Sequence, residues 1–122
     1  MGKRRMAKAV MGGALAAVFL LWSPAVPAVE TPRRIEVSAK RFAFTPAEIS
    51  LKKGEPVVLV FKSADVTHGI KFKELNAQAE IRKDTESELA LTPRETGDFV
   101  GHCSHFCGAG HGSMVLTLHV TE

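Results

Sequence analysis

Apolar and polar residues alternate over several short stretches of the chain, with the period of two that a half-buried β-strand produces. Four stretches show this alternation: 35–39, 49–51, 89–91 and 114–120. Another stretch, 57–61, is continuously apolar and rich in β-branched residues, as expected of a strand that is buried on both faces. The pattern therefore predicts an all-β chain of short strands, and such strands commonly pack as a β-sandwich.

The segments between the predicted strands contain residues that are typical of turns. Lys53–Pro56 brings a glycine and a proline directly before the buried strand. Only Glu74–Ile81 is expected to hold a short helical turn. Near the C-terminus, Phe99–Cys103 leads into a glycine-rich loop that precedes the last strand.

The first 28 residues differ from the rest and are predicted to be a secretory signal peptide. They combine a basic start, an uncharged apolar stretch over 9–22, and Ala28 at the expected cleavage position. The apolar stretch is shorter than the roughly 20 residues that span a bilayer, and a single membrane anchor is the alternative. We therefore expect a non-globular signal segment at 1–28, a linker at 29–34 and one folded domain at 35–122.

The net positive charge of the chain comes from this signal segment. Of the 16 basic residues four lie within the first 28 positions, and none of the 13 acidic residues does. The remaining chain thus has 12 basic and 13 acidic residues. This balance gives no basis for nucleic acid as a partner. A contact with a membrane is expected only through the N-terminus, if that segment is not cleaved.

One loop near the C-terminus gathers residues that bind metals. Cys103, Cys107, His111 and Met114 lie at intervals of four, four and three residues. This spacing also fits one face of an α-helix. Glycines in and beside the run argue against a helix, because each costs about 1 kcal/mol relative to alanine in a helix interior. We therefore predict a loop whose donors converge on one point.

The residue types in this loop favour copper. Thiols and thioethers select soft metals, and imidazole also suits copper. Zinc sites use cysteine, histidine and carboxylates, so Met114 argues against zinc. A disulfide between Cys103 and Cys107 is the alternative for an exported chain, but it would leave His111 and Met114 unexplained.

A second histidine ligand is expected from outside the loop. Copper electron-transfer sites commonly use two histidines, a cysteine and a weak methionine. His68 is the best candidate, because it follows the buried strand at a position from which it can reach the end of a neighbouring strand. A solvated surface histidine is the simpler interpretation of such a residue. His102 and His119 are predicted to point away from the site.

At these positions the chain closely resembles the binuclear copper (CuA) domain of cytochrome c oxidase subunit II, and also that of nitrous oxide reductase. The resemblance rests on the Cys-x3-Cys-x3-His-x2-Met pattern at 103–114 and on Asp-Val-Thr-His-Gly at 65–69, and it covers about 35–122. It implies a cupredoxin-like Greek-key β-sandwich. Blue copper proteins are similar in fold, but they place a single cysteine in this loop.

The resemblance also implies a ligand set for two copper ions. Cys103 and Cys107 would bridge both ions, His68 and His111 would each bind one, and Met114 would be a weak ligand. His105 would contribute its backbone carbonyl. The subunit II family often has glutamate at this position, so whether the His105 side chain also binds metal is left open.

The function implied is electron transfer in the periplasm or on the outer face of the cytoplasmic membrane. A c-type cytochrome or a similar donor would supply the electron, and a terminal oxidase or reductase would accept it. The domain would not be catalytic alone, but could serve an oxidoreductase as its electron-accepting subunit. The alternative function is copper binding or copper delivery by a protein of the same fold.

Overall fold

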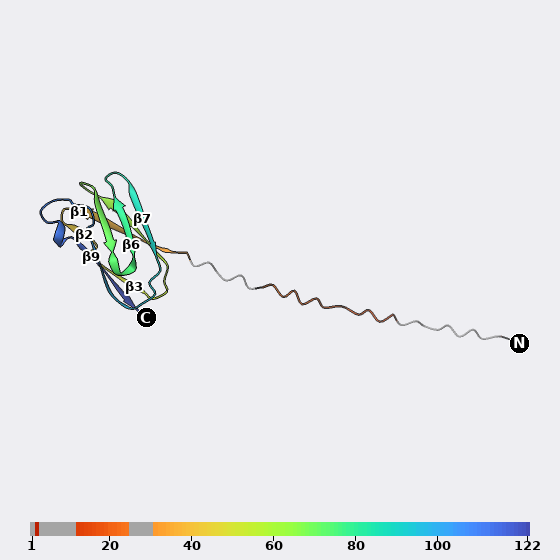
Figure 1. The fold of residues 1–122 in the computed structure, drawn as a ribbon. Coiled ribbons are helices and arrows are strands. Elements are labelled where there is room, and N and C mark those ends of the chain that lie inside the picture. The colour runs from red at the N-terminus through yellow and green to blue at the C-terminus, as the bar shows by residue number, and fades with distance from the viewer. Residues whose placement is uncertain (1, 3–11, 25–30) are drawn as a thin grey trace.

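The computed structural model of the chain describes residues 2, 12–24 and 31–122 (Figure 1). Residues 33–121 form a β-sandwich with two short 3-10 helices. The strands are β1 Arg33–Lys40, β2 Ala43–Thr45, β3 Glu48–Lys52, β4 Val57–Ser63, β5 His68–Phe72, β6 Ala77–Ile81, β7 Glu86–Leu91, β8 Gly97–His102 and β9 Val115–Thr121. The 3-10 helices are η1 Lys73–Leu75 and η2 His111–Ser113. The predicted all-β class is confirmed.

Two sheets make up the sandwich. One has the strand order β2-β1-β4-β7, and the other has the order β3-β9-β8-β5-β6. Two pairings are parallel, β1 with β4 and β3 with β9, and each joins segments that are distant in the sequence. Because β5, β8 and β9 lie in one sheet, the segments that continue from their ends can meet at one end of the sandwich.

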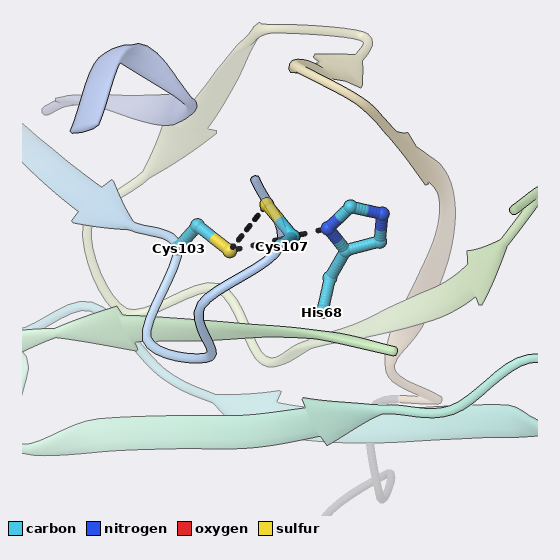
Figure 2. Close-up of side chains that lie close together, drawn as sticks. All are labelled: His68, Cys103 and Cys107. Atoms are coloured by element: carbon cyan, nitrogen blue, oxygen red, sulfur yellow. Dashed lines mark hydrogen bonds between the residues drawn. The ribbon is translucent and has the colours of Figure 1, made fainter. Parts of the chain in front are cut away.

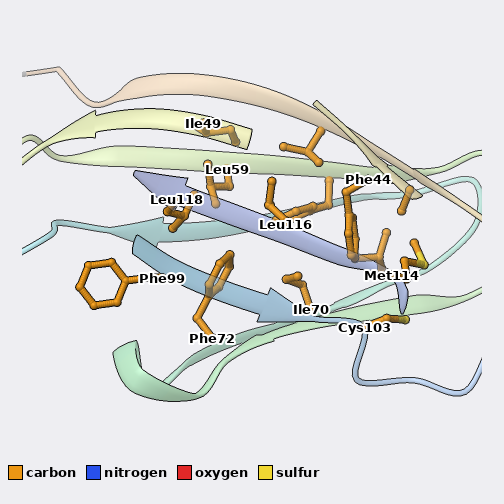
Figure 3. Close-up of a cluster of buried hydrophobic side chains, with 14 of the residues drawn as sticks. Phe44, Ile49, Leu59, Ile70, Phe72, Phe99, Cys103, Met114, Leu116 and Leu118 are labelled. Atoms are coloured by element: carbon orange, nitrogen blue, oxygen red, sulfur yellow. The ribbon is translucent and has the colours of Figure 1, made fainter. Parts of the chain in front are cut away.

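The core lies between the sheets (Figure 3). It contains alternating residues that predicted strands, such as Ile49 and Leu116, and also residues outside those stretches, such as Phe44 and Phe72. In β9, Leu116, Leu118 and Val120 are buried, whereas the residues between them are partly exposed. Phe44 of β2 and Phe61 of β4, two strands of the same sheet, meet edge to face within the core, with ring centroids 6.5 Å apart. Burial of these side chains stabilises the fold by about 25 cal/mol per Å² of apolar surface removed from water.

The expected helical turn over Glu74–Ile81 is only partly present. η1 covers Lys73–Leu75 and ends at Asn76, whose φ of 49° is left-handed. The rest of the segment is β6, which pairs antiparallel with β5. Pairing with a neighbouring strand therefore overrides a weak local preference, as is common for short segments.

The strand β1 begins two residues before the predicted start of the folded domain. Arg33 and Arg34 lie in the linker that the sequence predicts, yet they pair with the start of β4. Their side chains are polar and exposed, so the hydrophobic pattern could not mark them as part of a strand.

The described part of the N-terminal segment, 12–24, forms neither helix nor strand. Its large apolar side chains are exposed; Trp22, for example, is 94% exposed. In the described residues, no helix is both long and apolar enough to cross a membrane. The predicted signal peptide otherwise falls on residues outside the described ranges, and it stays a prediction.

A histidine links three strands on the outer face of the five-stranded sheet. His119 in β9 lies with Nδ1 2.6 Å from Asp98 Oδ1 in β8 and with Nε2 3.4 Å from Glu48 Oε1 in β3. These two carboxylates raise the pKa of the imidazole. The sequence prediction that His119 points away from the metal-binding residues agrees with this position.

This arrangement predicts a pH-dependent contribution of His119 to stability. Because its pKa is raised on folding, protonation stabilises the fold below the unfolded-state pKa of about 6.5, and the effect is lost as pH rises through the folded-state pKa. We expect the unfolding free energy of His119→Gln to fall below wild type in mild acid and to match it in alkali, measured by urea unfolding of the metal-free protein. A Glu48→Gln/Asp98→Asn background should remove the difference. A difference that does not change with pH would contradict the role of the charge.

Candidate metal centre

The residues predicted to bind metal meet at one end of the sandwich. His68 opens β5, Cys103 directly follows β8, and Met114 directly precedes β9. These three strands lie in the same sheet, so its geometry brings together residues that are far apart in the sequence. Cys107 lies in the loop between β8 and β9. All four side chains are buried, and His68 is completely inaccessible to solvent.

The two cysteine sulfurs form the middle of the cluster (Figure 2). Cys103 Sγ lies 3.9 Å from Cys107 Sγ, and both thiols are free. The Nδ1 atom of His68 is 4.0 Å from the Cys103 sulfur. On the other side, His111 Nδ1 is 3.8 Å and Met114 Sδ is 3.9 Å from the Cys107 sulfur. Each sulfur therefore has one imidazole nitrogen beside it.

His105 presents its backbone, and not its ring, to this cluster. Its carbonyl oxygen is 3.2 Å from the sulfur of Cys103. Its side chain is exposed, with Nδ1 3.1 Å from the Phe106 carbonyl oxygen. The carbonyl is thus the atom of His105 that lies among the other donors. His102 is exposed as well, in agreement with the expectation that it points away.

Backbone hydrogen bonds close the loop that carries these donors. The Cys103 amide donates to the Met114 carbonyl at 3.1 Å, which ties the two ends of the loop together. The Ser104 amide donates to the carbonyl of Gly69, next to His68. A Cβ atom on Gly69 would lie 2.4 Å from Ser104 Oγ, so a larger residue here would force the Ser104 side chain to move.

Asp65 orients the imidazole of His68. Its Oδ1 lies 2.7 Å from His68 Nε2, so the N–H of Nε2 donates a hydrogen bond to the carboxylate, and Nδ1 faces the sulfurs. Burial acts to raise the pKa of the Asp65 carboxyl, but hydrogen bonds from the Arg41 amide, His68 and the Val66 amide outweigh it and hold the pKa well below its usual range. The carboxylate is therefore ionised at neutral pH.

The metal-free thiol of Cys107 is held in its protonated form. Burial raises its pKa, and the neighbouring Cys103 adds to this effect. A metal that binds here must displace the proton, because the thiolate is the ligand.

The donor set fits a soft redox metal. Among the described residues, the cluster of potential metal-binding side chains is His68, Cys103 and Cys107. His111, Met114 and the His105 carbonyl extend it through the contacts above. Thiolates and a thioether select copper(I) and similar metals, and the thioether is not a zinc ligand.

Two residues around the cluster were not predicted from the sequence. Asp65 lies three positions before His68 in the Asp-Val-Thr-His-Gly stretch at 65–69. This spacing could have identified Asp65 as a hydrogen-bond partner of His68. Arg41 donates from Nε to the Cys107 carbonyl at 2.8 Å. No local pattern in the sequence marks that contact, because the acceptor is a backbone atom 66 positions away.

Sequence comparison finds a matching domain family and related proteins. The cupredoxin-like domain family matches residues 13–116. Cytochrome c oxidase subunit 2 of Thermus thermophilus is 31% identical over 102 residues, which cover 81% of this chain and 76% of that protein. Nitrous-oxide reductase of Cupriavidus necator is 29% identical over 84 residues, which cover 66% of this chain and 13% of the reductase.

A solved structure shares the fold. The periplasmic domain of subunit II of cytochrome oxidase from Bradyrhizobium japonicum superimposes with a TM-score of 0.70 at 18% identity, over 76% of this chain and 86% of that domain. At this identity the likeness concerns the fold alone, and it agrees with the cupredoxin-like Greek-key sandwich expected from the sequence.

Proposed function

Because the chain belongs to the cupredoxin-like family and is homologous to cytochrome c oxidase subunit 2, we propose that it is a copper-binding electron-transfer domain with a binuclear CuA site. The observation that carries this proposal is the pair of sulfurs 3.9 Å apart, each with its own imidazole nitrogen at 4.0 or 3.8 Å. A blue copper site holds one ion with a single cysteine, whereas two adjacent thiolates can be shared by two ions.

Each residue of the cluster has a distinct role in this proposal. Cys103 and Cys107 supply the two shared thiolates. His68 and His111 supply one imidazole each, Met114 supplies a weak thioether ligand, and His105 supplies its carbonyl oxygen. Copper bound by this set supplies a one-electron couple at a potential that the surrounding residues tune.

The protein contributes rigidity and exclusion of water. His68 and Met114 are fully buried, and the hydrogen bond to Asp65 fixes the His68 ring. The ligand positions can therefore stay almost unchanged when the charge of the site changes by one electron.

The loop also offers a face through which an electron can pass. Phe106 is 75% exposed, and its ring centroid lies 5.7 Å from that of His111. A redox partner that packs on Phe106 would therefore lie close to a ligand of the site. We propose a c-type cytochrome or similar donor and a terminal oxidase or reductase as acceptor, with the domain on the periplasmic side.

The test is copper content together with electron paramagnetic resonance (EPR). The purified, reduced protein is loaded with copper, freed of excess metal and measured. We expect two copper ions per chain, a purple colour and a seven-line hyperfine pattern, because one unpaired electron is shared by two copper nuclei. One copper per chain with a four-line pattern would exclude the binuclear site.

A further inference from the structure

One residue connects the two parts of the chain that carry the metal ligands. Arg41 lies in the corner between β1 and β2. Its backbone amide donates to Asp65 Oδ2 at 2.8 Å, and Asp65 Oδ1 in turn lies 2.7 Å from His68 Nε2. The position of Arg41 is thus tied to the residue that orients His68.

The side chain of Arg41 reaches the other part of the site. Its Nε donates to the backbone carbonyl of Cys107 at 2.8 Å in a partly buried position. A charged donor makes a shorter and stronger hydrogen bond than a neutral one. Within residues 31–122 Arg41 forms no ion pair, so this hydrogen bond is the evident function of its side chain.

The next residue, Phe42, supports the same turn by packing. A Cβ atom placed on Gly110 would lie 2.5 Å from the Phe42 ring, and one on Gly108 would lie 3.0 Å from it. Gly108 also has a φ of 137°, which disfavours other residues. The turn that follows Cys107 therefore rests directly on the corner between β1 and β2.

From these contacts we propose that Arg41 is a positioning residue that clamps the Cys107 turn to the His68 side of the site. The effect of this clamp on copper binding rests on the proposed function. The clamp would keep the two cysteine sulfurs in place before copper binds. Without the side chain, the Cys107 carbonyl loses its charged donor, while the backbone link to Asp65 remains.

The test uses two variants and a matched control. Arg41→Met removes the donor and the charge, whereas Arg41→Lys keeps a charged donor. Arg34→Met removes an exposed arginine near the start of β1, where it pairs with Glu88 in β7. Thermal unfolding of the metal-free proteins establishes that each variant is folded.

The first measurement needs no copper. The rate at which a thiol reagent labels Cys107 in the reduced, metal-free protein reports how often the turn opens. We expect about tenfold faster labelling in Arg41→Met, the lower end of the range for a hydrogen bond to a charged group. Loss of the positive charge alone would slow labelling, because a nearby cation favours the reactive thiolate. Faster labelling therefore indicates that the Cys107 turn opens more often, and slower labelling indicates only the loss of charge.

The second measurement uses the copper-loaded protein. Arg41→Met should release copper to a copper(I) chelator about tenfold faster and change the hyperfine splitting, and Arg41→Lys should restore most of both. Labelling and release at the rates of wild type and Arg34→Met would overturn the clamp while leaving the proposed function intact. Faster labelling in a protein whose wild type binds no copper would support the clamp and overturn the proposed function.

Discussion

Cys107→Ser is expected to abolish the seven-line EPR pattern and to reduce the bound copper to at most one ion per chain. The sulfur of Cys107 lies within 3.9 Å of Cys103 Sγ, His111 Nδ1 and Met114 Sδ, so its removal takes away the atom that connects these donors. A serine hydroxyl is a poor ligand for copper(I), because it lacks the softness of a thiolate. Copper analysis and EPR of the loaded variant measure both effects.

The matched control for this experiment is His105→Ala. The His105 ring is exposed, and only its carbonyl lies beside the Cys103 sulfur, so the variant keeps every donor of the proposed set. We expect it to retain two copper ions and the seven-line pattern. If Cys107→Ser keeps the shared-electron signal, the assignment of the bridging thiolates is wrong. If His105→Ala loses that signal, the ring is required.

Copper should raise the thermal unfolding midpoint of the domain by a large amount. A ligand that binds only the folded state adds about 4 kcal/mol when its free concentration is 1,000 times Kd. For a domain of this size, such a gain corresponds to an increase in Tm of about 15 to 30 °C. Calorimetry of the reduced metal-free and copper-loaded proteins at neutral pH measures the shift.

The gain in Tm should become smaller in acid. Copper must displace the protons of the thiols, and burial together with Cys103 raises the pKa of Cys107. As pH falls, protons compete more effectively, copper binds more weakly, and its contribution to the stability of the folded state declines. The Cys107→Ser variant, treated in the same way, should show a much smaller shift at every pH. An unchanged wild-type midpoint would contradict a preformed site.

The strands could be predicted from the sequence where burial imposes a clear pattern. The alternation in 114–120 and the apolar run 57–61 correspond to β9 and to the central strand β4. The prediction was weaker where pairing determines the structure. The segment 77–81 becomes a strand because it pairs with β5, and Arg33 and Arg34 join β1 although neither side chain is buried.

The candidate site was predictable to the extent that its donors lie close together in the sequence. Four of the side chains in the cluster come from 103–114. Their residue types alone, two cysteines, a histidine and a methionine, identify them as ligands suited to copper. His68 could be predicted as the second histidine ligand because it follows the buried strand, at a position from which it can reach the end of a neighbouring strand. The contacts that orient these donors were less accessible. Arg41 acts on a backbone carbonyl, and such an acceptor exists at every position, so composition and spacing do not mark it.

The parallel pairing of β3 with β9 has a consequence for the order of events during maturation. It joins Glu48 to Thr117, and Met114 stands just before β9. We expect pairings between such distant segments to form slowly, because a long stretch of chain must close first. The complete ligand set therefore comes into existence only when the last strand has joined the sheet. We expect copper insertion to follow folding, and a chaperone that delivers copper would have to recognise the finished domain and not the emerging chain.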